Sequence, residues 1–366
     1  MSLSQRVDAV IDAALEKRVV GCVVLVHEAG KRVYSRAAGF ADREAATPTT
    51  VDTIFRLASV TKPIVAAAVL KMIDLGLLSL DDPVTTYLPF FTMKAADGST
   101  PVITIRHLLT HTSGIAYDKI PDNVTRGSDP KPLFPLEENL RRLARSELAF
   151  KPGENWAYGM SIDVLGGVIG AINGDISDVE AATRRYVLDP LGMDDTRFMV
   201  TDPARLAAPY GDGDPMPFRM GEPQLIHSPF GGTNIMSPIR IFQREAAQCA
   251  GSGMAGTAGD FMKLLDAILV GNFLKPETRD AAFANQVGPY LTGRRDGEHF
   301  GYLGAVITDA RAAGWPHDGL VRWGGIWGNN WCLDPKTGTV LVAYTNTMWE
   351  GSDGKFRDDL RDAVFG

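Results

Sequence analysis

Strand-like segments lie at both ends of this chain, and mainly helical segments lie between them. Near the start, the runs GCVVLVHE and KRVYSRAAG flank the sequence EAG at 28–30, a pattern typical of a hairpin. Several strand-like segments follow one another within residues 300–346, with a hairpin turn expected at KTG, 336–338. Sequential hairpins favour an antiparallel sheet. The pattern predicts an α/β fold in which an antiparallel sheet, built from both ends of the chain, is flanked by helices.

Helical periodicity marks the two ends of the chain as well. Apolar residues fall on one face of a predicted first helix, at Val7, Val10, Ile11, Ala14 and Leu15. The segment KFRDDLRDAVF predicts a closing helix, and both terminal helices are expected to cover one face of the sheet. We expect a sheet-and-helix domain of residues 1–80 and 298–366, an inserted mainly helical domain of residues 81–297, and an active site in the cleft between them.

Charge and cysteine content argue against several classes of protein. The net charge of −7 argues against nucleic acid as a partner, because phosphate binding requires a basic surface. The apolar runs are too short to span a bilayer, and the first residues lack the features of a secretion signal. Cys22, Cys249 and Cys332 have no metal-ligand spacing and are expected to be buried thiols in a reducing compartment. The sequence therefore predicts a cytoplasmic protein.

A serine and a lysine stand at the start of the apolar helical segment RLASVTKPIVAAAVLKMIDLG, residues 56–76. Ser59 and Lys62 are three residues apart, so a helix places their side chains on one face. A serine hydroxyl becomes a nucleophile when a nearby base takes its proton, and a lysine amine can be that base in its neutral form. Ser-x-x-Lys occurs three times here, but only this copy opens an apolar helix. Spacing alone also allows Ser59 to be an N-cap and Lys62 a cation that reaches solvent.

Six further segments, taken in order, carry a resemblance that covers nearly the whole chain. They are SVTK at 59–62, LSLDDPVTTYLP at 78–89, TIRHLLTHTSG at 104–114, KPGENWAYGMSIDVLG at 151–166, GSGMAGTAGDFMKLLDAIL at 251–269 and WGGIWGNNW at 323–331. The chain resembles the superfamily of class C β-lactamases, penicillin-binding D,D-peptidases and family VIII carboxylesterases. The resemblance implies an acyl-enzyme mechanism that needs no cofactor and no metal.

The resemblance also implies a role for particular residues. Ser59 would be the acylated nucleophile, Lys62 its proton partner, and Tyr158 a general base whose phenolate needs nearby positive charge. Trp323-Gly324-Gly325 would occupy the place of the Lys-Thr-Gly motif on a strand beside the site. The backbone N–H groups of Ser59 and Ile326 would then form the oxyanion hole.

Two departures from the family pattern bear on the substrate. Met160 stands where the Tyr-x-Asn motif has asparagine, and Trp323 stands where β-lactamases have the cation that binds a substrate carboxylate. An apolar wall suits an uncharged small-molecule ester, so the pattern favours a carboxylesterase, with acyl transfer as a possible side activity. A β-lactamase, a D,D-peptidase or a D-aminopeptidase is the enzyme alternative, and a non-catalytic penicillin-binding-like sensor is the alternative from another class. The acyl chain, the alcohol and the oligomeric state are left open.

Four other side chains, from one tyrosine, one tryptophan and two histidines, are candidates for the site. Tyr117 follows the HTSG turn and is expected to point into the cleft, and Trp327 is expected to line the substrate pocket because it follows the oxyanion strand. His107 and His111 are four residues apart, so they are expected to share a helix face. Because zinc needs three or four ligands, we interpret this pair as fixing the Thr112-Ser113-Gly114 turn by hydrogen bonds.

Overall fold

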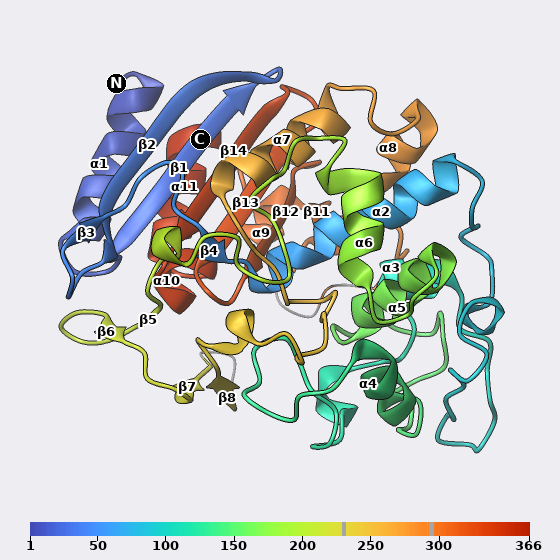
Figure 1. Ribbon diagram of the computed structural model, residues 1–366. Coiled ribbons are helices and arrows are strands. Elements are labelled where there is room, and N and C mark those ends of the chain that lie inside the picture. Colours follow the sequence, from blue (N-terminus) through green and yellow to red (C-terminus); the bar gives the residue numbers. More distant parts are fainter. Residues whose placement is uncertain (229–231, 291, 293–295) are drawn as a thin grey trace.

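The computed structural model describes residues 1–228, 232–290, 292 and 296–366. Within these residues, the main sheet has eight antiparallel strands in the order β10-β11-β12-β13-β14-β1-β2-β3 (Figure 1). The predicted α/β fold with an antiparallel sheet built from both chain ends is therefore confirmed. The strands are β1 Gly21–Glu28, β2 Lys31–Asp42, β3 Thr47–Pro48, β10 Glu298–Phe300, β11 Ala305–Ile307, β12 Val321–Gly325, β13 Asn329–Asp334 and β14 Thr339–Thr345.

Both predicted hairpins are present. Ala29 and Gly30 join β1 to β2 with positive φ angles of 49° and 74°, as a tight hairpin turn requires. The sequence KTG at 336–338 joins β13 to β14, and Gly338 there has a φ of 73°. The side-chain hydroxyl of Thr337 donates to Asp334 Oδ2 at 2.7 Å, which fixes this turn. The KTG sequence is therefore a turn and no part of a substrate site.

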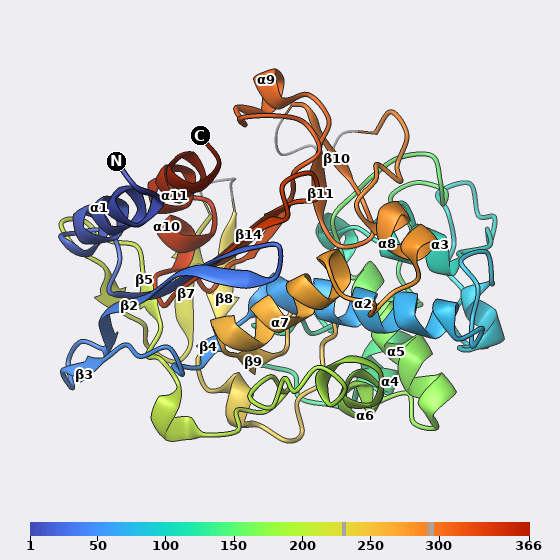
Figure 2. The same cartoon turned by 90° about the horizontal axis from the view of Figure 1, so that it is seen from above.

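Helices cover both faces of the sheet (Figure 2). Helices α1 (Leu3–Leu15) and α11 (Lys355–Phe365) pack against each other on one face, where Val7, Val24 and Phe356 belong to one buried apolar cluster. This arrangement confirms the predicted place of the two terminal helices. Helix α7 (Ala258–Leu269) packs against β1 and β14. Two short helices, α9 (Ala310–Ala313) and α10 (Met348–Ser352), accompany the C-terminal strands.

The helix that follows Ser59 connects the sheet to a second group of helices. Helix α2 (Thr61–Asp74) is apolar around most of its surface and is buried along most of its length, which is typical of a central helix. It packs against α5 (Ser161–Asn173) and α6 (Val179–Thr183). Around these lie α3 (Ile105–Leu109), α4 (Leu136–Leu143) and α8 (Pro276–Ala282). The division into a domain of residues 81–297 and a domain formed by the rest stays a prediction. Helix α7 lies within residues 81–297 but packs on the sheet.

Short strands connect the two groups of elements. Strand β4 (Phe55–Arg56) pairs with β9 (Ala255–Gly256), and β5 (Tyr210–Gly211) pairs with β6 (Phe218–Arg219). The hairpin of β7 (Gln224–His227) and β8 (Thr233–Met236) was not predicted from the sequence. Among the described residues, no helix has both the length and the apolar character needed to cross a membrane.

Candidate active site

Ser59 lies in the turn that leads into α2. A 3-10 turn covers Ala58–Val60, and α2 begins directly after it. The N-cap of α2 is Val60 and no side chain caps the helix, so the N-cap interpretation of Ser59 is wrong. Ala58 has a φ of 44°, a left-handed conformation that costs a non-glycine residue about 1–2 kcal/mol. The backbone is therefore strained next to the serine hydroxyl, as it often is at functional sites.

Lys62 and Tyr158 both reach the hydroxyl of Ser59. The Tyr158 hydroxyl lies 2.8 Å from Ser59 Oγ, and Lys62 Nζ lies 3.3 Å from the same atom. Lys62 Nζ also lies 4.6 Å from the centroid of the Tyr158 ring. The three side chains predicted from the motifs therefore converge on one oxygen atom, although 99 residues separate Ser59 from Tyr158.

Lys62 is held in place by a backbone carbonyl group, and a buried carboxyl group fixes the residue that carries this carbonyl. Lys62 is 4% exposed, and its Nζ donates to the carbonyl oxygen of Gly251 at 2.7 Å. Burial opposes the ammonium charge, but Tyr117, Tyr158 and Asp163 together favour it more strongly, so the pKa of Lys62 is raised. This pKa argues against the neutral lysine that a base at this position would require. Burial raises the pKa of the Asp163 carboxyl as well, although the Lys62 cation opposes that shift.

A cavity of about 860 Å³ opens beside Ser59, and we call it the substrate cavity. Tyr117, Tyr158 and Trp323 line it and are in mutual contact, with ring centroids 5.5 Å apart for the two tyrosines and 5.2 Å apart for Tyr158 and Trp323. Trp323 Nε1 donates to the Tyr158 hydroxyl at 3.3 Å. The predicted place of Tyr117 in the cleft agrees with this geometry. Trp349, which the sequence did not single out for the pocket, lines the cavity too.

Strand β12 ends against the turn that carries Ser59. A Cβ atom at Gly325 would lie 2.1 Å from the Leu57 carbonyl oxygen and 3.4 Å from the Ser59 nitrogen. Only glycine allows this close approach, and Gly324, Gly325 and Ile326 thereby line the cavity beside Ser59. The approach brings the end of β12 to the place where the second donor of an oxyanion hole would be needed.

Two arginines line the substrate cavity, and each has a carboxylate partner. Arg126 Nε lies 3.2 Å from Asp129 Oδ2. Arg322 lies 2.8 Å from Glu298 and 3.6 Å from Asp353, which itself lines the cavity. Both arginines in this cavity therefore have a carboxylate partner within the protein.

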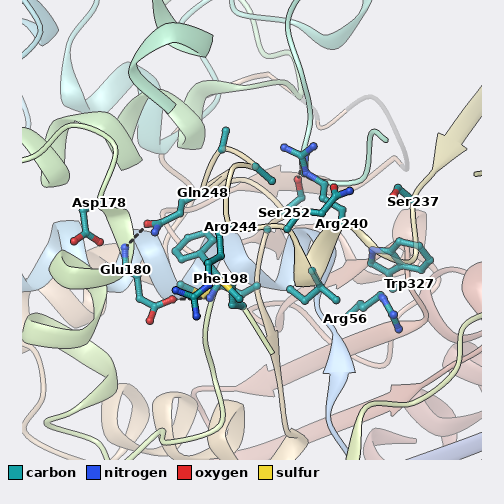
Figure 3. A pocket seen from close by; sticks show the side chains of 18 of the residues that line it. Arg56, Asp178, Glu180, Phe198, Ser237, Arg240, Arg244, Gln248, Ser252 and Trp327 are labelled. Carbon is teal, nitrogen blue, oxygen red and sulfur yellow. Dashed lines mark hydrogen bonds between the residues drawn. The ribbon is translucent and has the colours of Figure 1, made fainter. Parts of the chain in front are cut away.

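Trp327 is not part of this cavity as the structure describes it. It lines a separate cavity of about 290 Å³, the second cavity, together with Arg56 (Figure 3). Its ring packs against the Arg56 guanidinium, whose central carbon lies 5.7 Å from the ring centroid. The expected place of Trp327 in the substrate pocket is therefore corrected, because its side chain lines the second cavity.

The two histidines do not share a helix face, which corrects the expectation from their spacing. Helix α3 ends at Leu109, and His111 has a φ of 57°. His107 Nδ1 instead bonds to Thr104, which caps this helix, so it does not fix the following turn by its side chain. The His111 ring packs 4.9 Å from the Tyr158 ring. Within the described residues, no group of three or more potential ligands could hold a metal ion.

Asp163 and Gly251 are the site residues that sequence reasoning missed. Asp163 lies on α5 within a segment that reads as an ordinary apolar helix, SIDVLGGVIGAIN. In the sequence, the signal for Asp163 was a single charged residue within an otherwise apolar segment. Asp163 Oδ1 accepts from the Gly251 N–H at 3.2 Å, so the carboxyl fixes the peptide that holds Lys62. A Cβ at Gly251 would lie 2.5 Å from Asp163 Oδ2.

Comparisons with known proteins agree with this geometry. The model of the family described as Beta-lactamase matches residues 7–364. The chain is 45% identical to Esterase EstB of Burkholderia gladioli, across 100% of this chain and 95% of that protein. It is 28% identical to Lovastatin esterase of Penicillium rubens, across 97% and 95% of the two chains. The structure of EstCE1, a hydrolase with promiscuous acyltransferase activity, superposes with a TM-score of 0.93 at 36% identity, covering 100% of this chain and 98% of that one.

Proposed function

The chain belongs to the β-lactamase family, and we propose that it is a carboxylesterase that hydrolyses small uncharged esters through an acyl-enzyme on Ser59. Whole-length similarity to Esterase EstB supports the reaction class. The observation that carries the assignment is the convergence of Tyr158 and Lys62 on Ser59 Oγ, at 2.8 and 3.3 Å. A hydroxyl, a phenol and an amine in hydrogen-bond reach are the groups that serine acylation needs.

In the proposed mechanism, Tyr158 moves the proton and Lys62 keeps its charge. Ser59 Oγ attacks the ester carbonyl carbon as the Tyr158 phenolate takes the Ser59 proton, and the carbonyl becomes an oxyanion. The phenol then gives this proton to the leaving alkoxide, so an alcohol departs and the acyl-enzyme remains. The raised pKa of Lys62 supports these separate roles of Tyr158 and Lys62, because an ammonium group beside the Tyr158 ring favours the phenolate.

Water completes the cycle in the second half of the reaction. Tyr158 takes a proton from the attacking water, the acyl group leaves as a carboxylic acid, and Ser59 Oγ regains its proton. The N–H groups of Ser59 and Ile326 are proposed to bind the oxyanion in both halves, which the close approach of β12 supports. An alcohol that replaces this water receives the acyl group instead, so acyl transfer is the expected side activity, as the description of EstCE1 states for that enzyme.

Intact mass spectrometry after brief exposure to a p-nitrophenyl ester of a short acyl chain tests the nucleophile. We expect one added acyl group, mapped to the Ser59 peptide, and a loss of turnover of at least about 10⁴-fold in Ser59→Ala. Ser128→Ala is the matched control, because Ser128 lines the same cavity and also has a lysine three residues later. Full turnover in Ser59→Ala would reject the proposal. If turnover depends on Ser59 but the adduct is too short-lived, a phosphonate label replaces the ester.

A β-lactamase or D,D-peptidase is the alternative enzyme, and a binding protein without catalysis is the other alternative. Penicillins and D-Ala-D-Ala peptides carry a carboxylate, whereas both arginines in the substrate cavity already have carboxylate partners. We expect kcat/KM for the short-chain aryl ester to exceed that for a chromogenic cephalosporin. The reverse order would favour the β-lactamase assignment, and acylation without turnover of either compound would favour a sensor.

A further inference from the structure

The second cavity lies on the far side of the segment Gly251–Met254 from Lys62. Ser252 lines both cavities, and Gly253 and Met254 line the second one. The same segment offers the Gly251 carbonyl to Lys62. Figure 3 shows Arg56, Arg240 and Trp327 toward one side of this cavity and Asp178 and Glu180 toward the other. The cavity therefore has a basic side and an acidic side.

The acidic side already has its partners within the protein. Asp178 caps α6 by accepting from the Ala181 N–H at 2.9 Å. Glu180 accepts from the Phe198 N–H at 2.9 Å and lies 3.9 Å from Arg197. These contacts hold both carboxylates in place on the acidic side, so an anionic ligand is expected to bind on the basic side.

The basic side is different, because its cations, the half-buried Arg56 and the buried Arg240, bond to carbonyl groups. Arg56 donates to the carbonyl oxygens of Pro238 and Ala207, at 2.7–3.0 Å. Arg240 is 6% exposed and donates to the carbonyl oxygen of Asp129 at 2.9 Å. Neither guanidinium has an ion pair with a carboxylate among the described residues. Two donors of Arg56 and three of Arg240 remain beyond these contacts and a long contact to Cys249.

Burial makes this arrangement unfavourable for the protein alone. Taking a guanidinium out of water without a counter-charge is costly, and burial lowers the pKa of Arg56 to about 10. Glu222 is the carboxylate that opposes this shift, without an ion pair to Arg56 among the described residues, and its oxygens accept from Ser237 Oγ and the Ile239 N–H. Arg244 lines the same cavity, is exposed, and has no ion pair in the described part of the chain. An anion in this cavity would be stabilised by the guanidiniums that line it.

A buried acceptor on the same cavity wall indicates a second feature of the ligand. Gln243 lines the cavity, and its side-chain oxygen Oε1 is buried with no hydrogen-bond partner among the described residues. A buried acceptor without a donor is unfavourable by about 1–3 kcal/mol. We propose that the second cavity binds a small organic carboxylate that also carries a hydrogen-bond donor, such as a hydroxy acid. The carboxylate lies between the arginines, and the donor reaches Gln243.

Calorimetric titration of the full chain with sodium 3-hydroxybutyrate tests this site. We expect saturable binding, weaker binding of butyrate, which lacks the donor, and no binding of the neutral butyramide. Arg56→Gln and Arg244→Gln should each weaken binding by about tenfold or more, since each removes a charge-assisted contact. Gln243→Leu should remove the preference for 3-hydroxybutyrate over butyrate.

Arg126→Gln is the matched control, because Arg126 is the partly exposed cation of the substrate cavity. The site is confirmed if this variant binds 3-hydroxybutyrate as the parent chain does. Loss of binding in Arg126→Gln, with none in Arg244→Gln, would place the anion in the substrate cavity and overturn the proposal. Absence of saturable binding, or equal binding of butyramide, would overturn it too. Arg244 is exposed, so its variant keeps the test valid even if Arg56→Gln fails to fold.

Discussion

The substrate cavity and the second cavity are both lined by Ser252, and they differ in the groups that their arginines contact. In the substrate cavity Arg126 and Arg322 face carboxylates of the protein itself. In the second cavity Arg56 and Arg240 face carbonyl oxygens, and neither has an ion pair among the described residues. The comparison shows that the number of arginines near a cavity does not predict an anionic ligand. What matters is whether the protein already supplies the counter-charge.

After the loss of Ser59 itself, the largest expected effect comes from removing Lys62, the cation that contacts the reacting groups. Lys62→Met should lower kcat/KM for a short-chain aryl ester by about 10³-fold, because the Tyr158 phenolate loses the charge that favours it. Lys131→Met is the control, since Lys131 follows Ser128 at the same spacing on an exposed loop. Retention of most activity in Lys62→Met would mean that Tyr158 does not need the Lys62 charge to act as the base.

The next effect tests the close packing of β12 on the Ser59 turn. Gly325→Ala places a Cβ atom 2.1 Å from the Leu57 carbonyl oxygen, so the strand or the turn must move. We expect kcat to fall by about 10²-fold, the size seen when one oxyanion donor is lost. Gly221→Ala is the control because the nearest atom there is 3.7 Å away. Equal kcat in both variants would remove the support for Ile326 as an oxyanion donor.

A third change adds to the substrate cavity a cation that could bind a substrate carboxylate. Trp323→Lys should raise the ratio of kcat/KM for a carboxylate-bearing ester over an uncharged ester by roughly tenfold, the value of one ion pair of about 1.4 kcal/mol. Absolute rates should fall, because Trp323 Nε1 no longer donates to Tyr158. Trp323→Leu separates the two effects by removing the indole without adding charge. An unchanged ratio in the lysine variant would mean that position 323 does not face the substrate.

The smallest effect concerns the carboxyl group behind Lys62. The pKa of Asp163 is raised from its ordinary value of 3.8, so the folded protein holds this proton more tightly than the unfolded chain does. Its contribution to stability is present below pH 3.8 and is lost as the pH rises through the raised value. Urea unfolding between pH 4 and 7 should show a shallower pH dependence of the free energy of unfolding in Asp163→Asn than in the parent chain. Identical slopes would contradict the assigned direction of the shift.

The sheet and three central site residues could be predicted from the sequence because their signals are local. Alternating apolar residues and tight turns mark β1, β2, β13 and β14, and each pairing follows from its neighbour in the chain. Ser59 and Lys62 are three residues apart, and Tyr158 lies in a recognisable segment. Only their meeting at one oxygen required the folded chain.

The features that escaped prediction depend on contacts between distant segments. Lys62 and Gly251 are 189 residues apart, and no pattern near either one indicates that they meet. The second cavity is built from β4, α6 and the loop before α7, three segments without a shared motif. His111 was misplaced for a local reason, since its left-handed backbone ends the helical spacing on which the expectation rested.

The pairing of β1 with β14 has a consequence for biosynthesis. Cys22 lies opposite Thr345 and Val26 lies opposite Leu341, so the strand made first is bonded to the strand made last. During translation, before β14 has been synthesised, the edge of β1 in the hairpin of β1 and β2 is unpaired. Such an unpaired edge can bond to strands of other chains. A chain that stops before residue 339 therefore lacks β14 as well as its final helices, so β1 and β2 have no strand that joins them to β12 and β13.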